Sequence, residues 1–378
     1  METEKRELIK KEFHHLGTNY FNTAYFGPSP YSAKAMITRA MQKELDPSFY
    51  AYNIWMGIPD RVREKIATLL KCNPDNIAHS TSVSDVINIV ANGLKFNKGD
   101  RVVSINKDYP SDVLPWMVNE KHRPYEFKLL DCTYPTGKWL KENLPKQTKV
   151  FNVSHVTFDT GKKMDLIDLG KTCREMGVLL IIDATQSLGG LNISEEEMKY
   201  IDVLACASYK WMLGPYGHAF AYFSNHALEL IDSKTGNWIN SPNSKVVYNL
   251  LDYTTETLPG ARKFDRGQTP NMLTMSCLEA SLDFLNSIGL ETIQKHNAKI
   301  RDYFLDNYPR NNFDLITPIE NKGNILALRG KNIDPVELET ELKHNNVDVS
   351  VREGNIRLSF HIFNSKKQVD TLIKALDI

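Results

Sequence analysis

The lysine at position 210 has an unusual setting for a charged side chain. It follows the apolar run VLACAS (residues 203–208) and precedes WMLGPYG, whose Gly and Pro residues exclude a long helix directly after it. Lysine is rarely buried without a partner. A lysine amine in such surroundings is suited to nucleophilic chemistry, in which it forms a Schiff base with a carbonyl compound.

A carboxylate ends the preceding apolar run. GVLLIIDAT (residues 177–185) carries Asp183, and Gln186 follows closely. A carboxylate behind buried aliphatic residues needs a cationic partner or a strong hydrogen bond. The alternative interpretation of Asp183 is an ordinary cap at the end of a strand.

Hydroxyl groups open a predicted helix at HSTSVSD (residues 79–85), and such a helix start binds anions through its free N–H groups. Taken alone, these residues indicate an N-terminal cap. Tyr109 follows the run RVVSI (residues 101–105), where a single aromatic residue usually serves packing. Together with Lys210 and Asp183, however, these features suit a pyridoxal phosphate (PLP) site. The aspartate would keep the ring nitrogen protonated, the hydroxyls would hold the phosphate and Tyr109 would cover the ring face.

Short apolar runs alternate with helical patterns through the first two-thirds of the chain. Continuous apolarity suits strands that are covered on both faces. The sequence therefore predicts an α/β fold with a mostly parallel sheet and helices on both sides, and such folds bind ligands beyond the carboxyl ends of their strands. The predicted strands are RVVSI, KVFNVSHV, GVLLIIDAT, VLACAS and GHAFAYFS; the predicted helices are DRVREKIATLLK, SDVINIVANGLK and DLIDLGKTCREMG, the last ending at Gly177.

The pattern changes near Asn271. A long helical stretch is interrupted near Gly289, and further strands and helices follow up to a final helix that begins near Ser365. This part predicts a smaller α+β domain. We expect residues 20–265 to form the large domain, and residues 266–378 with 1–19 to form the small one.

Composition excludes several classes of protein. The 378 residues carry no formal net charge, which argues against a nucleic-acid partner. The five cysteines form no CxxC pair, so we expect no metal site and no disulfide framework, and reduced thiols fit a cytoplasmic protein. No signal peptide is apparent, and no apolar stretch is long enough for a membrane helix.

Seven motifs in order make nearly the whole chain resemble the class V aminotransferases, a family that includes cysteine desulfurases, kynureninases and isopenicillin-N-epimerase-like proteins. These motifs are YFNTAYFGPSP, HSTSVSD, SHVTFDTG, IIDATQS, ASYKWMLGPYG, RKFDRGQTPN and IRLSFHIFNS. The resemblance implies PLP as the cofactor, fold type I, and a homodimer whose subunits share their active sites.

The resemblance also implies a role for each matching residue. Lys210 would form the Schiff base and move protons, Asp183 would pair with the pyridine nitrogen, and Arg357 would bind the α-carboxylate of an amino-acid substrate, with Arg352 as a second candidate. Gln186 would lie near the phenolic oxygen of the cofactor or the lysine. Further cofactor contacts would come from Thr81, Ser82, Tyr109, Ser208, Tyr209 and, across the dimer interface, Gln268 and Thr269. Asn22 and Tyr25 would face the substrate. Phe26 and Trp55 are further aromatic candidates for the pocket.

Two departures from the family pattern bear on the reaction. Phe158 stands where many relatives carry an asparagine that faces the cofactor, and its presence removes one hydrogen bond to the phenolic oxygen. No cysteine follows Cys277, whereas desulfurases that form a persulfide need a cysteine on a mobile C-terminal loop. Tyr209, directly before the lysine, also resembles kynureninases more than desulfurases. The missing cysteine and Tyr209 both argue against a desulfurase that works through a protein persulfide.

The function that the sequence favours is a class V aminotransferase acting on an amino acid. The alternatives are a PLP-dependent lyase, of the cysteine or cystine C–S lyase or kynureninase-like kind, and an epimerase. A non-catalytic sensor that binds PLP is less favoured, because the Lys, Asp and Arg set is complete. A lysine aldolase without a cofactor is disfavoured by the phosphate loops.

Overall fold

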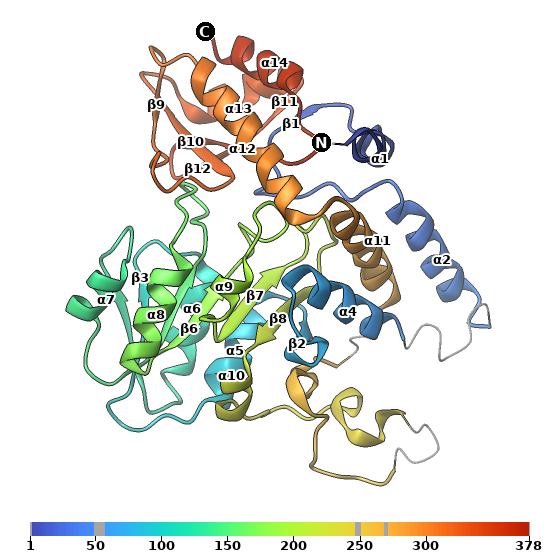
Figure 1. The fold of residues 1–378 in the computed structure, drawn as a ribbon, viewed down its shortest axis with the longest axis vertical. Coiled ribbons are helices and arrows are strands. Elements are labelled where there is room, and N and C mark those ends of the chain that lie inside the picture. Colours follow the sequence, from blue (N-terminus) through green and yellow to red (C-terminus); the bar gives the residue numbers. More distant parts are fainter. Residues whose placement is uncertain (1, 49–56, 246–250, 268–270, 378) are drawn as a thin grey trace.

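A seven-stranded sheet forms the centre of the protein (Figure 1). The computed structural model describes residues 2–48, 57–245, 251–267 and 271–377. All neighbouring strands run parallel apart from β8, which is antiparallel to β2 and to β7. The predicted, mostly parallel sheet is therefore confirmed. Its strand order is β2 (Ile77–Ser80), β8 (Ala219–Phe223), β7 (Val203–Ala207), β6 (Leu179–Asp183), β5 (Thr148–Ser154), β3 (Arg101–Ile105) and β4 (Glu126–Leu130).

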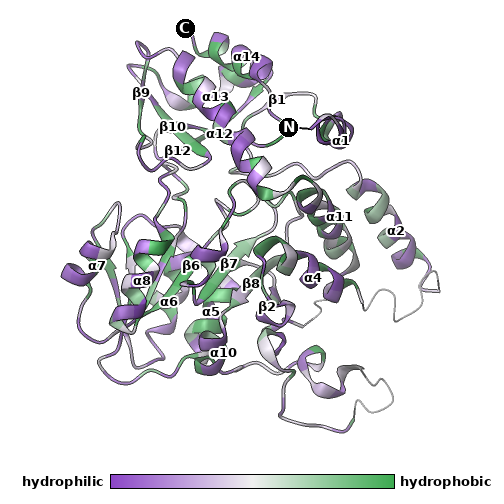
Figure 2. Ribbon diagram, viewed as in Figure 1, coloured by the Kyte–Doolittle hydropathy of each residue, from purple (hydrophilic) through white to green (hydrophobic). Residues whose placement is uncertain are grey.

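The inner strands of this sheet are buried along their whole length. Every residue of β6 and of β7 is buried, and Figure 2 shows hydrophobic residues gathered on these strands while the outer faces of the helices are hydrophilic. Strands covered on both faces carry continuous apolar runs. This is why the sequence pattern identified them.

Helices connect the strands and cover both faces of the sheet. The predicted end of α8 is confirmed, because Gly177 adopts a left-handed conformation with φ of +68° at its C-terminal cap. Asp165 caps the other end by accepting hydrogen bonds from the first turn. The helices of this region are α4 (Ile58–Leu70), α5 (Val83–Gly93), α6 (Pro110–Asn119), α7 (Gly137–Asn143), α8 (Leu166–Met176), α9 (Glu195–Met198) and α10 (Asn225–Leu230).

A second, antiparallel sheet belongs to the C-terminal part of the chain. Its strand order is β12 (Ser350–Arg352), β13 (Asn355–Ser359), β10 (Ile325–Gly330) and β9 (Phe313–Leu315). The run VDVSVRE predicts one strand, but the structure divides it into β11 (Val347–Asp348) and β12, because β11 pairs with β1 (Asn19–Tyr20) near the N-terminus. The remaining helices are α1 (Thr3–Phe13), α2 (Ala33–Leu45), α11 (Met272–Ile288), α12 (Leu290–Asn307), α13 (Pro335–His344) and α14 (Lys366–Leu376).

The long C-terminal helical stretch breaks at Gly289, as predicted, where φ is +84°. Helix α11 packs on α2 and α4 beside the large sheet, whereas α12 packs on α14 beside the small one. The division at residues 265 and 266 remains a prediction, and these contacts favour a boundary nearer to Gly289. Within the described residues, no helix is long and apolar enough to cross a membrane.

Candidate active site

A cavity of about 210 Å³ lies at the carboxyl ends of the central strands. Parallel strands deliver the residues that follow them to one edge of a sheet, and this edge is where α/β proteins bind ligands. The cavity brings together six residues that the sequence singled out: Thr81, Ser82, Tyr109, Asp183, Tyr209 and Lys210.

Lys210 is buried in this cavity between two aromatic rings. Its Nζ lies 5.2 Å from the centre of the Tyr109 ring and 5.5 Å from that of Tyr209. The pKa of Lys210 is lowered to about 8, chiefly by burial; Asp183 opposes this effect, and the positive charges of Arg357 and Arg352 add to it. Because the unprotonated amine is the nucleophile, the setting prepares Lys210 to react near neutral pH.

The N-terminal segment packs directly on the backbone of this lysine. The amide of Gly27 donates a hydrogen bond of 2.8 Å to the carbonyl of Tyr209. A Cβ atom on Gly27 would lie 1.8 Å from the carbonyl oxygen of Lys210, so only glycine permits this approach. A segment that is distant in the sequence thus packs against the backbone of the lysine loop.

Asp183 reaches the cavity from the end of β6. Its carboxylate accepts a hydrogen bond of 2.8 Å from the amide of Thr185. Burial raises its pKa, while the Thr185 hydrogen bonds and the charge of Lys210 work in the opposite direction. A buried carboxylate of this kind is suited to pair with a cationic ring nitrogen.

The opposite side of the cavity is the start of α5. Ser82 is the N-cap, and its side chain accepts a hydrogen bond from the amide of Asp85. The first N–H groups of a helix lack partners within the helix and attract anions. Arg266 pairs with Asp85 and so ties this turn to the segment that precedes residues 268–270.

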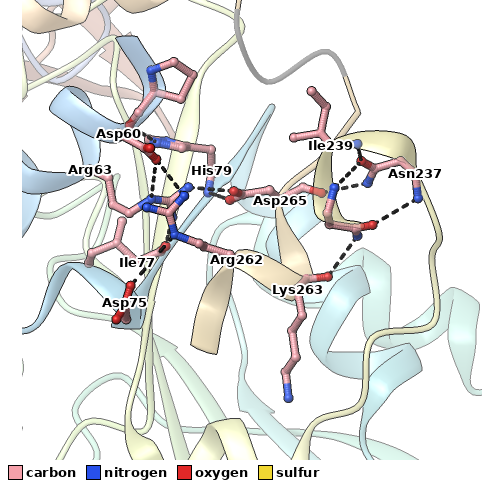
Figure 3. A network of polar contacts seen from close by, with 12 residues as sticks. Asp60, Arg63, Asp75, Ile77, His79, Asn237, Ile239, Arg262, Lys263 and Asp265 are labelled. Carbon is pink, nitrogen blue, oxygen red and sulfur yellow. Dashed lines mark hydrogen bonds and ion pairs between the residues drawn. The ribbon is translucent and has the colours of Figure 1, made fainter. Parts of the chain in front are cut away.

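A buried ion pair supports the strand that leads into this turn. The Arg63 guanidinium from α4 binds Asp265 at 2.6 Å and also donates to the carbonyl of Ile77. Asp265 in turn accepts a hydrogen bond of 2.8 Å from the amide of His79, two residues before Thr81. Figure 3 shows these groups between β2 and the segment around Arg262.

Arg63→Ala is expected to lower the free energy of unfolding by about 3–5 kcal/mol, because it leaves the Asp265 carboxylate buried without its cation. Arg262→Ala is the matched control. Its guanidinium binds the partly exposed Asp60 at 2.7 Å, and a pair of this kind contributes about 0–1 kcal/mol. Urea unfolding of both variants measures the difference, and equal losses would contradict the role given to Arg63.

Two predicted cofactor residues lie outside the lining of the cavity. The Gln186 amide donates to the carbonyl of Ala24 at 3.1 Å and accepts from the Trp211 indole at 3.0 Å. Ser208 is fully buried, and its hydroxyl lies 2.6 Å from Nδ1 of His218. Neither side chain is among the residues that line the cavity, and their predicted contacts with the cofactor remain predictions.

The Ser208 hydroxyl is the start of a directed chain of hydrogen bonds. His79 Nε2 lies 2.9 Å from the carbonyl of Pro59 and must donate to it, which leaves its Nδ1 to accept from His218 Nε2 at 3.1 Å. His218 Nδ1 is then an acceptor, so Ser208 donates to it. Burial lowers the pKa of His218 to about 3, and its ring is therefore neutral. His218, rather than Ser208, lines the cavity.

Arg357 lies next to the cavity and is almost completely buried. Its Nη1 donates to the carbonyl of Phe158 at 2.8 Å, and its Nε donates to Ser350 Oγ at 3.2 Å. Burial, together with the charge of Arg352, lowers its pKa to about 9. Among the described residues, no ion pair joins Arg357 to an acid. A buried cation in this state favours an anionic ligand, and a carboxylate fits the planar guanidinium in two hydrogen bonds.

Phe158 connects the two sides of the substrate region. Its ring packs edge-on against Tyr109, with ring centres 5.4 Å apart, while its carbonyl holds Arg357. Arg352 lies over the ring of the half-exposed Tyr25 at 5.7 Å. The residue that departs from the family pattern therefore contacts both the predicted ring-stacking residue and the predicted carboxylate-binding residue.

Asn22 is not among the residues that line the cavity; it contacts the C-terminal part of the chain. Its amide nitrogen donates to Asp348 and to the carbonyl of Val349, and its Oδ1 is buried without a partner in the described structure. Gln268, Thr269 and Trp55 lie outside the described residues, so their predicted contacts with cofactor or substrate remain predictions.

Comparison with known proteins agrees with this geometry. The sequence model of the family described as Aminotransferase class-V matches residues 55–372. This chain belongs to the class V aminotransferase family. A probable cysteine desulfurase of Methanothermobacter thermautotrophicus is 26% identical, over 95% of this chain and 94% of that protein. An uncharacterized aminotransferase of Bacillus subtilis, YcbU, is also 26% identical, over 88% of each chain.

Solved structures show the same fold. The cystine C–S lyase C-DES in complex with its product, cysteine persulfide, superposes with a TM-score of 0.86 at 16% identity, over 96% of this chain and 98% of that one. The predicted fold type I is therefore confirmed. As a class V aminotransferase the chain is an enzyme, and its cofactor is PLP.

The residues of this class V enzyme fit that cofactor. The cavity offers hydroxyls and the start of α5 for a phosphate, Asp183 for a ring nitrogen, a tyrosine ring for the ring face and Lys210 for the carbonyl carbon. Each of these groups has a counterpart among the chemical groups of PLP. The described residues contain no cluster of His, Cys, Asp or Glu that could hold a metal ion.

Sequence reasoning missed several residues that line the cavity of this class V enzyme, among them Tyr216 and His218. Tyr216 lines the cavity and stacks on Tyr209 at 4.0 Å, with Phe26 beside it. His218 lines it because β7 and β8 pair, which places the backbone carbonyl of His218 3.1 Å from the amide of Ser208. The signal was present in the motif ASYKWMLGPYG, whose second tyrosine follows the lysine in the same short loop.

Proposed function

We propose that this class V enzyme is a PLP-dependent lyase that cleaves the carbon–sulfur bond of cysteine or cystine by direct β-elimination. Relatives named as probable cysteine desulfurases support the substrate class. Arg357 supports a substrate with an α-carboxylate, because its buried charge needs an anion. The sequence favoured transamination; these relatives support the lyase alternative better.

The observation that carries direct elimination is the position of the cysteines. Within the described residues, no cysteine lines the cavity, and four of the five are buried. Burial raises the pKa of Cys72 and of Cys173 to about 12, which disfavours the reactive thiolate.

The hairpin that carries Arg352 and Arg357 also leaves no place for a cysteine loop. Arg352 pairs directly with Asn355, and only Glu353 and Gly354 connect β12 to β13. Both have positive φ, of 48° and 73°, as in the tight turns that join two strands. A protein persulfide has no carrier in this region.

The residues of the chain account for the steps of such a reaction. Arg357 would bind the substrate carboxylate, and Lys210 would hold the cofactor. The Nζ of Lys210, when it is unattached, would accept the α-proton of the substrate as the sulfur group leaves from the β-carbon. PLP, when bound, supplies the ring that accepts electrons. Asp183 keeps a proton on its ring nitrogen, and the aromatic rings around Lys210 exclude water from the reacting atoms.

Product analysis tests this proposal. With cystine as substrate, we expect pyruvate, ammonia and cysteine persulfide to form without any added 2-oxo acid. With cysteine, hydrogen sulfide replaces the persulfide. Product formation that requires a 2-oxo acid would establish transamination instead, and inversion of the α-carbon without elimination would establish an epimerase.

Treatment with N-ethylmaleimide is expected to leave the elimination rate unchanged, because no described cysteine contributes to the cavity. The measurement compares pyruvate formation before and after alkylation, with mass spectrometry to count the modified thiols. A cysteine desulfurase that acts through a persulfide provides the positive control, because alkylation inactivates it. Inactivation of this enzyme in step with modification of one cysteine would contradict direct elimination.

We also propose a cytoplasmic homodimer, in which Gln268 and Thr269 approach the cofactor of the partner subunit. The support for this proposal is the family pattern, in which the loop resembled by RKFDRGQTPN reaches the phosphate of the neighbouring subunit.

A further inference from the structure

Three carboxyl groups lie together behind the cavity. Asp183 ends β6, Asp112 belongs to the first turn of α6, and Asp108 precedes that helix. Their exposed fractions are 4%, 0% and 9%. Ser154 places two of them side by side: its hydroxyl lies 3.2 Å from Asp112 Oδ2, and it pairs with Asp183 in the neighbouring strand, so that the Ser154 and Asp183 side chains lie on the same face of the sheet. Three negative charges so close in a buried site are strongly unfavourable, so at least one of these groups must carry a proton.

The hydrogen-bond donors around Asp108 identify it as an anion. It accepts from the amide of Ser154 at 2.9 Å, from the Ser154 hydroxyl at 2.5 Å and from the amide of Tyr109 at 2.8 Å. Three donors of this kind stabilise a carboxylate even where solvent is absent.

The same count shows that Asp112 has fewer donors than Asp108. Its Oδ1 accepts from Asn152 Nδ2 at 2.8 Å, and Asn152 is held in that orientation by the indole N–H of Trp116. Its Oδ2 lies 3.2 Å from the Ser154 hydroxyl, but the only hydrogen of that hydroxyl is directed to Asp108 at the shorter distance. Oδ2 therefore has no donor and is the atom on which a proton belongs.

We propose that Asp112 is a positioning residue: it is protonated at Oδ2 and donates a hydrogen bond to Asp183, so that Asp183 faces the cofactor as the single, weakly basic anion. The proposal rests on the role of Asp183 at the ring nitrogen. A neutral O–H donor favours the ionised form of its acceptor. Asp183 thus remains charged despite its burial, and its attraction for the ring proton is moderated.

The charges around the pair agree with this assignment. Burial raises the pKa of Asp112, and the negative charges of Asp183 and Asp108 raise it further, while Asn152 and Ser154 oppose them. Burial raises the pKa of Asp108 only to about 6, because the Ser154 and Tyr109 donors oppose it. Lys210 acts on Asp183 from the other side of the cavity.

Asp112→Asn and Asp112→Ala separate a protonated from an ionised Asp112. Asparagine presents an N–H donor and an acceptor in the places of the O–H and Oδ1, so it imitates the protonated acid but cannot ionise. We expect the pH midpoint of the visible absorbance of the bound cofactor, and the cofactor dissociation constant, to match wild type in Asp112→Asn. Asp112→Ala is expected to shift the midpoint and to raise the dissociation constant about tenfold, since it removes a buried donor. A shift in Asp112→Asn as large as that in Asp112→Ala would overturn the proposal.

Infrared spectroscopy gives an answer that does not depend on either variant folding. Wild-type holoenzyme labelled with ¹³C-aspartate should show the C=O stretch of a protonated, buried carboxyl group at neutral pH, and its absence would overturn the proposal. Asp183→Asn tests the underlying assumption separately. If that variant keeps wild-type cofactor affinity and absorbance, the role of Asp183 itself is wrong, whatever the result for Asp112.

Discussion

Lys210→Ala is expected to lower kcat by roughly 10⁴-fold or more, because the variant loses both the nucleophilic amine and the base that accepts the α-proton. Nothing else in the cavity replaces it: Lys210 is the only lysine among the residues that line the described cavity. Pyruvate formation from cystine measures the loss.

A second readout concerns the covalent attachment of the cofactor. After borohydride reduction, mass spectrometry should detect the cofactor mass on Lys210 of the wild-type chain and on no residue of the variant. Lys199→Ala, on an exposed lysine paired with Glu196, is the matched control and should behave as wild type. Full activity of the Lys210 variant would refute the proposed site.

Arg357→Ala is expected to lower kcat/KM by roughly 10²–10³-fold, mainly through KM, because an α-carboxylate is bound in the ground state and in the transition state alike. Steady-state kinetics with cystine measures both parameters. Arg352→Ala should have a smaller effect, since Arg352 is only half-buried and already contacts Tyr25.

A substrate analogue distinguishes substrate binding from a purely structural role of Arg357. Cystamine and cysteamine lack the carboxylate, so their slow conversion should be indifferent to the loss of the guanidinium. Arg357 also holds the carbonyl of Phe158, and if that contact were its whole purpose, Arg357→Ala would impair substrates with and without a carboxylate equally. That outcome would contradict the assignment of Arg357 as the carboxylate-binding residue.

The sequence predicted the position of Lys210 and Asp183 because strands buried on both faces leave a continuous apolar signature. Asp183 ends such a strand and Lys210 follows another, and parallel strands end at one edge of the sheet. The start of α5 was predictable for a similar reason, since cap residues and hydroxyl groups are local features of the sequence.

The contacts that the sequence did not predict depend on side-chain direction and on pairing between distant segments. Ser208 follows a correctly predicted strand, but its hydroxyl turns to His218 because β8 lies antiparallel beside β7. Gln186 turns to Ala24, more than a hundred residues earlier in the chain. The proximity of Asp112 to Asp183 follows from how α6 packs on the sheet, which no local pattern encodes.

The contact of Gly27 with the lysine loop also connects that loop to the C-terminal part of the chain. The segment that carries Gly27 is itself held by the end of the chain, through β1 on β11 and through the Asn364 side chain, which donates to the carbonyl of Tyr20. A displacement of β11 or of Asn364 would therefore be transmitted through the Gly27 segment to the backbone of the lysine loop.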